Sequence, residues 1–304
     1  MQPSEARILM FDGLCPFPLT PLTGDGLDKA ALVRLVSRIV VAGPASIGVL
    51  GSTGIYPYLS RGERRAALEA AVGAAEGIPV IAGVGSLRTR DLLVHAADAQ
   101  AVGAAALLVA PVSYHRLTER EVYGLYQDVA EASSVPIVVY DNPGTTGFTF
   151  SDELHARIAA LPRVAAIKIP PPPAGTAAAR VATLRSVLPG GVSVGISGDW
   201  AAAEALAGGC DGWYSVIAGV FPGPAQAIAE AARSGNPEKA REASATLGPV
   251  WSLFREHGSL RVVVAIAEDL GLVGSDCLPR PLRGLDGPAR SRVREAVRSA
   301  GLAP

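Results

Sequence analysis

The sequence predicts an α/β fold, a (β/α)8 TIM barrel followed by a C-terminal helical extension. Three observations support this fold class. Short apolar or β-branched segments recur, most of them at intervals of roughly 21 to 30 residues, helical patterns lie between them, and the alternation stops after the eighth segment. Helices that connect successive strands imply a parallel sheet. Eight such units favour closure into a barrel over an open sheet.

The strands are expected where the short apolar segments lie, at residues 8–11, 46–50, 79–82, 106–109, 136–140, 165–169, 192–196 and 213–217. Several intervening helices follow a capping side chain: Asp28 precedes 29–41, Ser60 precedes 61–75, and Thr118 precedes 122–132. Glu121 completes a capping box with Thr118, and Ser151 begins a further helix. The expected elements therefore alternate regularly along the chain.

The C-terminal part of the chain contains only helical patterns. They cover residues 224–233, 237–256, 260–270 and 288–299, and a segment rich in proline and glycine interrupts them at 271–287. We therefore expect a barrel over residues 1–222 and a C-terminal helical region, packed on the barrel, over residues 223–304.

Charge and hydropathy exclude several classes of function. The 27 basic residues nearly balance the 28 acidic ones, and no dense basic run with interleaved aromatic residues indicates a nucleic-acid partner. No apolar segment approaches the roughly 20 residues that span a bilayer, so no membrane association is expected. The first residues lack the layout of a secretory signal peptide, and we expect a cytoplasmic protein.

Metal and disulfide chemistry are not indicated either. The three cysteines, Cys15, Cys210 and Cys277, are odd in number and lie far apart, and the four histidines are isolated in the sequence. We therefore expect reduced thiols and no metal site.

Lys168 is the most informative residue, because it places one cation within an otherwise apolar predicted strand. Side chains alternate along a strand, so Lys168 shares a face with Ala166 while the bulky Ile167 and Ile169 face the helices. Lys168 then points into the barrel mouth, where desolvation lowers a lysine pKa and a neutral amine can attack a carbonyl. The alternative is a side chain that extends past the strand end into water.

Two further groups lie where the active-site face of such a barrel is expected, at the C-terminal ends of the strands. Tyr140 ends the neighbouring predicted strand at a height similar to that of Lys168, and its phenol could transfer protons, although a tyrosine with a solvated hydroxyl is also common there. After the second strand, residues 51–54 (Gly-Ser-Thr-Gly) form a turn whose amides and hydroxyls suit a carboxylate or a phosphate. Such loops are often ordinary turns.

Together these motifs resemble the dihydrodipicolinate synthase / N-acetylneuraminate lyase family of class I aldolases. The resemblance extends from Thr20 to at least Leu270. Its motifs are Gly-Ser-Thr-Gly at 51–54 with Leu-Ser at 59–60 and Glu-Arg at 63–64, Tyr-Asp-Asn-Pro at 140–143 with Thr-Gly at 146–147, Ile-Lys at 167–168, Ser-Gly-Asp at 197–199 and Gly-Trp-Tyr-Ser-Val at 212–216.

The resemblance implies a lyase or aldolase in which Lys168 forms an imine with pyruvate or a related 2-oxo acid. Tyr140 would relay protons and Ser52 would exchange them with solvent. Gly51, Ser52, Thr53 and the backbone of Tyr214 would bind the substrate. The resemblance also implies no cofactor, an aldehyde or its adduct as the second reactant, and a homodimer or homotetramer.

The sequence departs from the family pattern near the expected second substrate. Thr145 stands where an arginine usually binds that substrate's carboxylate, and loss of the guanidinium removes bidentate recognition. Ser113 occupies the position of a family tyrosine, and Tyr114 follows one residue later. Four prolines, residues 170–173, follow the lysine. These departures argue against lysine biosynthesis proper and leave the second substrate open.

Several alternatives remain. The chain could be dihydrodipicolinate synthase itself with another cation in place of the arginine, or a dehydratase or decarboxylating relative that uses the same imine. It could also be a catalytically silent member that binds a metabolite. A phosphate-binding barrel isomerase is disfavoured, because no clear glycine-rich phosphate loop follows the last two predicted strands.

Overall fold

The computed structural model describes residues 9–24 and 26–302 and contains an eight-stranded parallel sheet. Its order is β1-β10-β9-β8-β7-β6-β5-β4. The strands are β1 (Gly13–Pro16), β4 (Ile47–Val49), β5 (Val80–Gly83), β6 (Ala106–Val109), β7 (Ile137–Tyr140), β8 (Val164–Ile169), β9 (Ser193–Ile196) and β10 (Gly212–Ser215). The expected parallel β/α architecture is confirmed.

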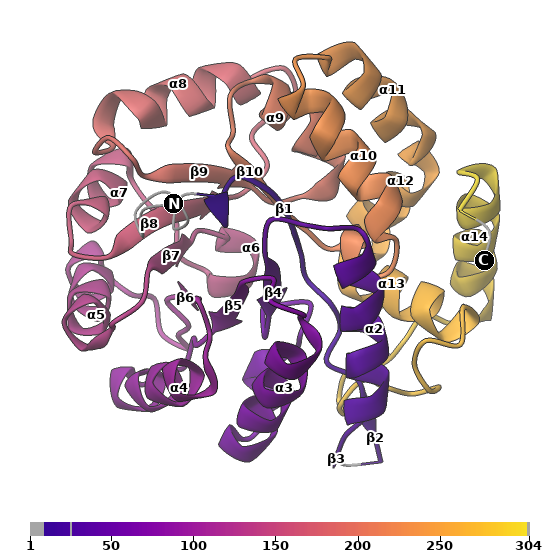
Figure 1. The fold of residues 1–304 in the computed structure, drawn as a ribbon, viewed down its shortest axis with the longest axis horizontal. Helices are drawn as coiled ribbons and strands as arrows, with labels where there is room; N and C mark the ends of the chain where they lie inside the picture. Colours follow the sequence, from indigo (N-terminus) through magenta and orange to yellow (C-terminus); the bar gives the residue numbers. More distant parts are fainter. Residues whose placement is uncertain (1–8, 25, 303–304) are drawn as a thin grey trace.

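The sheet closes into a barrel where its first and last strands meet. β1 pairs in parallel with β10, and on its other side the Leu14 carbonyl accepts a hydrogen bond of 3.0 Å from the amide of Ala45, just before β4. Figure 1 shows the strands at the centre, surrounded by helices. Closure removes the exposed edges that an open sheet would present.

The short helix α6 (Pro143–Thr146) lies in the loop after β7. In addition, one longer helix follows each strand of the barrel. They are α2 (Lys29–Val41), α3 (Arg61–Ala74), α4 (Thr89–Val102), α5 (Glu119–Ala132), α7 (Asp152–Ala159), α8 (Ala177–Val187), α9 (Ala202–Ala207) and α10 (Pro222–Arg233). Between β1 and α2, the short strands β2 (Leu22–Thr23) and β3 (Gly26–Leu27) pair antiparallel. The expected capping residues act as predicted: Asp28 and Ser151 accept bonds from helix amides, and Ser60 and Thr118 form capping boxes.

The first strand lies later in the chain than expected. Ile8 is outside the described residues, and the rest of the 8–11 segment forms no strand; β1 instead begins at Gly13. Met10 and Phe11 are nevertheless buried, whereas Leu9 is exposed, and the Phe11 carbonyl accepts a hydrogen bond from the Ser193 hydroxyl at the start of β9. Met10 and Phe11 therefore cover the N-terminal end of the barrel. An apolar segment in the sequence indicates burial, but it does not show whether the buried residues form a strand.

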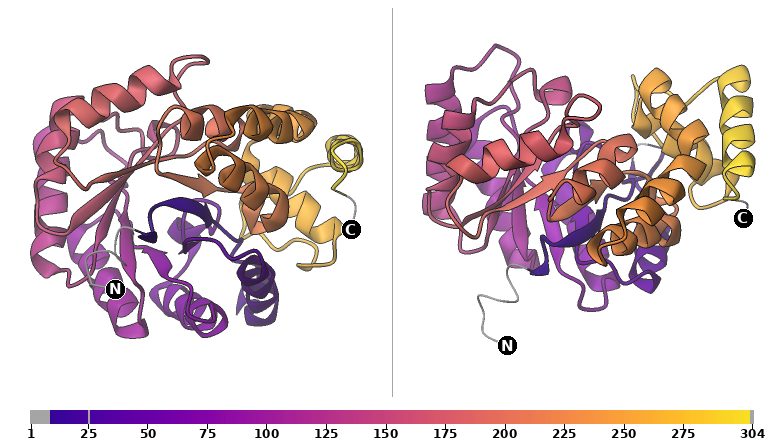
Figure 2. Two further views of the ribbon diagram at one scale, coloured as in Figure 1. Left: turned by 45° about the horizontal axis from the view of Figure 1, so that its top comes forward. Right: turned by 90° about the horizontal axis from the view of Figure 1, so that it is seen from above.

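Beyond the barrel helices the chain is helical, as expected, in α11 (Pro237–Thr246), α12 (Gly248–His257), α13 (Ser259–Asp269) and α14 (Gly287–Ser299). The single helix expected at 237–256 is wrong, because α11 and α12 are separate. Pro249 lacks an amide hydrogen and restricts the residue before it, which places a helix start there. In Figures 1 and 2 these helices gather on one side of the barrel, with α14 outermost.

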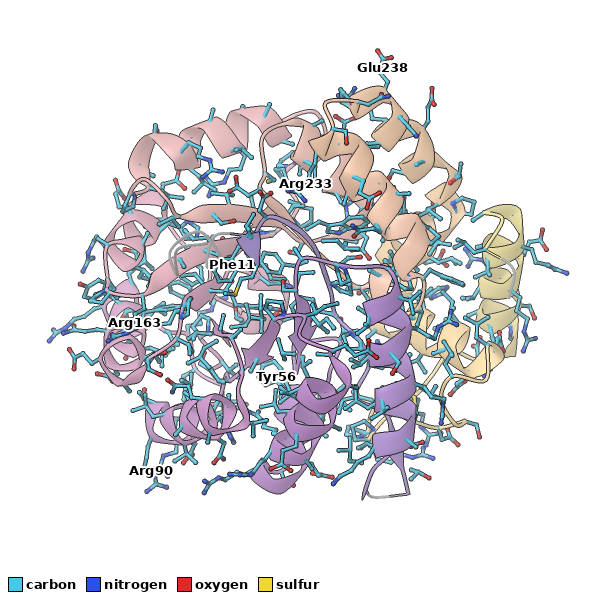
Figure 3. All side chains as sticks on the ribbon, in the orientation of Figure 1. Phe11, Tyr56, Arg90, Arg163, Arg233 and Glu238 are labelled. Atoms are coloured by element: carbon cyan, nitrogen blue, oxygen red, sulfur yellow. The ribbon has the colours of Figure 1, made fainter. Side chains whose placement is uncertain are left out.

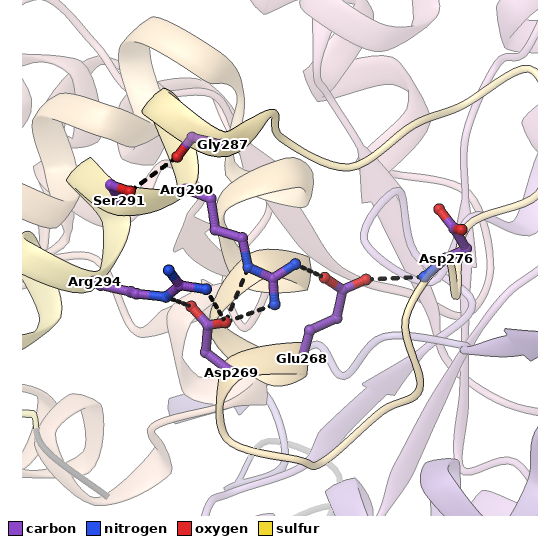
Figure 4. Close-up of polar contacts among 7 residues, drawn as sticks. All are labelled: Glu268, Asp269, Asp276, Gly287, Arg290, Ser291 and Arg294. Atoms are coloured by element: carbon purple, nitrogen blue, oxygen red, sulfur yellow. Dashed lines mark hydrogen bonds and ion pairs between the residues drawn. The ribbon is translucent and has the colours of Figure 1, made fainter.

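An ion-pair cluster holds α14 against α13. Arg290 donates hydrogen bonds to Glu268 and Asp269, and Arg294 also binds Asp269 (Figure 4). Glu268 accepts a further bond from the amide of Asp276. The division of the chain after residue 222 stays a prediction.

Side chains separate by polarity across the molecule. Arg90 and Glu238 are exposed and project outward, whereas Phe11 and Tyr56 lie buried inside the layer of helices (Figure 3). Among the described residues, no helix combines the length and apolar character needed to cross a membrane.

Candidate active site

Lys168 lies near the C-terminal end of β8, beside Tyr140 at the end of β7. The two residues are partners in the parallel pairing of these strands. Lys168 is 5% exposed, and its Nζ lies 4.3 Å from the centre of the Tyr140 ring. The side chain therefore points into the barrel mouth and does not extend past the strand end into solvent.

The phenol of Tyr140 is held by polar neighbours. Its oxygen lies 3.2 Å from the Thr145 hydroxyl and accepts a hydrogen bond of 3.2 Å from the side-chain amide (Nδ2) of Asn142. Burial opposes ionisation of the phenol, but the charge of Lys168 and hydrogen bonds from Ser52, Thr145 and Asn142 outweigh it and lower the pKa of Tyr140. A lowered pKa suits a phenol that exchanges protons with a reacting group.

The loop after β4 brings two hydroxyl groups to the same place. Ser52 and Thr53 both line the cavity that contains Lys168. At Gly51 a Cβ would lie 2.5 Å from the ring of Phe17, so this turn requires glycine. Leu50, which enters the turn, has a φ of 60°, a strained conformation that such sites often retain.

The cavity around Lys168, here called the reaction cavity, has a volume of about 340 Å³. It is lined by Ser52 and Thr53 of the loop after β4, by the Tyr140 phenol and by Tyr214 at the end of β10. Its remaining wall contains Phe17, Asn142, Pro143, Gly144, Pro170, Pro171, Ser197, Gly198, Asp199, Trp200, Val216, Phe254 and Ser259. The reaction cavity thus combines an amine, a phenol and hydroxyl groups in one space.

A second hollow, here called the side cavity, has a volume of about 370 Å³. It shares four residues with the reaction cavity, namely Ser52, Thr53, Tyr140 and Ser259. Its other lining residues are Tyr56, Pro57, Tyr58, Val112, Thr145, Gly258 and Leu260. Tyr140 therefore contributes to both cavities.

Asp199 is a site residue to which the sequence reasoning gave no role. It is 1% exposed and accepts hydrogen bonds from Trp213 Nε1 at 2.9 Å and from the amides of Val216 and Ile217 at 3.1 and 2.6 Å. Burial raises the pKa of Asp199 to about 6 despite these bonds. The carboxylate thereby positions the segment that follows β10, which contributes Val216 to the wall of the reaction cavity. An acidic residue in the loop just after a predicted strand was the available signal.

A buried pair behind the strand ends was also missed. His155 Nε2 lies 3.3 Å from a carboxylate oxygen of Asp141, without hydrogen-bond geometry. The His155 ring stacks on Phe150, and the amide of Asp141 donates a bond to the carbonyl of Lys168. Asp141 therefore connects the pair with both strands of the site: it follows Tyr140 at the end of β7 and is hydrogen-bonded to Lys168 on β8. No local pattern connects Asp141 with His155.

Thr145, Ser113 and Tyr114, the departures from the family pattern that could still contribute to the site, fall in different places. Thr145 contacts the Tyr140 phenol and lines the side cavity. Ser113 and Tyr114 line neither cavity, and Tyr114 is 90% exposed. Within the part of the chain that the structure describes, no group of three or more His, Cys, Asp or Glu side chains could hold a metal ion.

Comparisons with known proteins agree with this geometry. The model of the dihydrodipicolinate synthetase family matches residues 10–300. The 4-hydroxy-tetrahydrodipicolinate synthase of Methylococcus capsulatus is 33% identical over 286 residues, which cover 93% of this chain and 96% of that protein.

Solved structures give the same result. Dihydrodipicolinate synthase from Agrobacterium tumefaciens has a TM-score of 0.94 and 45% identity, covering 98% of this chain and 100% of that one. The chloride-inhibited dihydrodipicolinate synthase from Acinetobacter baumannii, complexed with pyruvate, has a TM-score of 0.87 and 27% identity, covering 96% and 100%. The chain therefore belongs to the dihydrodipicolinate synthetase family of Schiff-base lyases.

Proposed function

We propose that this enzyme forms an imine between Lys168 and pyruvate or a related 2-oxo acid, and that it makes or cleaves a carbon–carbon bond. The observation that carries the proposal is the buried Lys168 amine beside the Tyr140 ring, in a cavity with two hydroxyl residues. Further support comes from the relative that was crystallised with pyruvate.

The reaction begins when the Lys168 nitrogen adds to the ketone carbon and loss of water gives the imine. Tyr140 relays the protons of these steps, and Ser52 connects it with solvent. Removal of a proton from the adjacent carbon gives an enamine, which bonds to the aldehyde carbon while the aldehyde oxygen takes up a proton. Water then hydrolyses the imine, releasing a 4-hydroxy-2-oxo acid and the free amine; the reverse sequence cleaves the bond.

The substrate carboxylate has a suitable binding place in the loop after β4. The Thr53 hydroxyl and the amides near Gly51 and Ser52 can donate hydrogen bonds to it, and the backbone of Tyr214, which also lines the cavity, can contribute a further contact. Because these neutral donors bind the carboxylate, it does not need to form an ion pair with Lys168. The amine therefore stays available for the ketone.

Borohydride trapping tests the proposal directly. Reduction in the presence of pyruvate should add the reduced pyruvyl group to Lys168 and to no other lysine. The chain offers internal controls, because its two other lysines, Lys29 and Lys239, are both exposed. Peptide mass spectrometry should find them unmodified, and Lys168→Met should abolish labelling. Labelling absent from Lys168 across a panel of 2-oxo acids refutes the proposal.

A second candidate is 4-hydroxy-tetrahydrodipicolinate synthase itself, which the names of the similar proteins favour. Thr145, in place of a guanidinium, speaks against it. A coupled assay with pyruvate and aspartate semialdehyde decides between the two, since negligible turnover by a chain that traps pyruvate removes this candidate.

The assembly and the compartment stay predictions. We propose a homodimer or homotetramer, and light scattering coupled to gel filtration measures its mass. The cytoplasmic location likewise stays an expectation from the sequence.

A further inference from the structure

The cavities that meet at Tyr140 contain very little charge. Lys168 and Asp199 are the charged residues that line the reaction cavity, and none lines the side cavity. Lys168 is consumed by the imine, and the Asp199 carboxylate is already engaged by Trp213 and by backbone amides. Within the described residues, neither cavity therefore offers a cation that could pair with a second carboxylate.

Two guanidinium groups that lie beside rings of the cavity walls do not fill this gap. Arg255 lies over the Trp200 ring, 5.9 Å from its centre, but is exposed and lines neither cavity. Arg64 lies 5.0 Å from the Tyr56 ring, and donates hydrogen bonds of 3.0 Å to the carbonyls of Tyr56 and Gly85. The Arg64 guanidinium is thus engaged by backbone carbonyls beside the side cavity and does not line that cavity.

Several residues that line the reaction cavity are apolar instead. Pro143, Pro170 and Pro171 face the space together with Trp200 and Phe254. Rings and prolines of this kind bind an apolar body and provide no compensation for the desolvation of a charge. A carboxylate brought against them would lose its water without gaining a partner, which costs several kcal/mol.

We infer that the second substrate is an uncharged aldehyde with an aromatic or branched apolar body, which packs against Trp200 and Phe254 while its carbonyl meets the enamine beside Tyr140. This inference rests on the proposed imine chemistry and adds the chemical class of the electrophile. It also gives Trp200 a role in specificity, because Trp200 has the largest apolar side chain among the residues that line the reaction cavity.

A matched pair of aldehydes isolates the effect of charge. Benzaldehyde and 4-carboxybenzaldehyde differ only by one carboxylate, and the hydroxy-oxo acid product of each with pyruvate can be followed by liquid chromatography and mass spectrometry. Borohydride trapping of Lys168 with pyruvate alone comes first, since it tests the imine without any aldehyde. We expect kcat/KM for benzaldehyde to exceed that for 4-carboxybenzaldehyde by about tenfold or more.

Three variants connect the preference with named residues. Trp200→Ala should lower kcat/KM for benzaldehyde by about tenfold, chiefly through KM, and should lower kcat/KM for the small acetaldehyde by a clearly smaller factor. Thr145→Arg should shift the ratio toward 4-carboxybenzaldehyde by about tenfold, because it supplies a guanidinium. Arg255→Ala is the matched control, and the ratio of the two aldehydes should stay the same.

The outcomes separate this inference from the proposed function. Failure to trap pyruvate on Lys168 refutes the imine chemistry. If trapping succeeds, equal or better turnover of 4-carboxybenzaldehyde overturns the inference alone, and so does the absence of turnover with both aldehydes. A loss of 4-carboxybenzaldehyde turnover in Arg255→Ala also overturns it, since Arg255 would then be the missing cation.

Discussion

Replacing Asp199 by asparagine removes a buried acid while nearly preserving its size. In the folded protein, burial raises the pKa of Asp199 from the ordinary value of 3.8 to about 6, even though Trp213 and two backbone amides donate hydrogen bonds to it. A carboxyl with a raised pKa stabilises the fold below its unfolded pKa, and this contribution is lost as the pH rises through the folded pKa. The window therefore lies between about pH 4 and pH 7.

The magnitude follows from the two pKa values of Asp199. They differ by about 2 pH units, and each corresponds to about 1.4 kcal/mol, so the free energy of unfolding should change by about 3 kcal/mol across this window. Asparagine does not titrate, so the difference between wild type and Asp199→Asn contains this contribution. Urea unfolding at pH 4, 5, 6 and 7 measures it.

Asp98→Asn is a matched control with the opposite sign. A hydrogen bond from Arg61 lowers the pKa of Asp98, so its contribution is present above the unfolded pKa and is lost as the pH falls through the folded pKa. The wild type should therefore lose stability relative to Asp98→Asn only at the acidic end. A difference between wild type and Asp199→Asn that stays constant from pH 4 to pH 7 would refute the reasoning.

Three further substitutions test the packing around the site and the C-terminal helices. Gly51→Ala places a Cβ 2.5 Å from the Phe17 ring, so it should lower the free energy of unfolding by about 1–3 kcal/mol and raise the KM for pyruvate. His155→Ala removes a buried ring that stacks on Phe150 and lies 3.3 Å from the Asp141 carboxylate, and urea titration should show a loss of about 2–5 kcal/mol from the cavity left behind. Arg290→Ala breaks ion pairs to α13, and the loss of about 1 kcal/mol should shrink at high salt.

Each of these substitutions has its own comparison. Gly62→Ala adds a Cβ in open space within α3, so it should stabilise the protein by about 0.5–1 kcal/mol and leave the KM unchanged. His155→Phe keeps a ring on Phe150, and wild-type stability in that variant would show that the contact with Asp141 contributes nothing. Arg298→Ala removes an exposed ion pair within α14. Equal effects of Arg298→Ala and Arg290→Ala would contradict the predicted role of the cluster.

The sequence by itself determined the order of most elements and the place of the lysine. Hydrophobic periodicity and capping act over a few residues, so Ser60 and Thr118 marked helix starts correctly without knowledge of the fold. Alternation along a strand also oriented Lys168, and its neighbour Tyr140 followed from the parallel order of the strands. These inferences need only local patterns and one rule of topology.

Only the tertiary structure decided what those residues meet. Met10 and Phe11 cover the barrel end, because Gly13–Pro16 is the segment that aligns with β10. The contact of Asp141 with His155, the donors around Asp199 and the uncharged walls of both cavities join segments that are distant in the chain. Such contacts depend on how helices and loops pack after the barrel closes, and local sequence patterns carry no record of that packing.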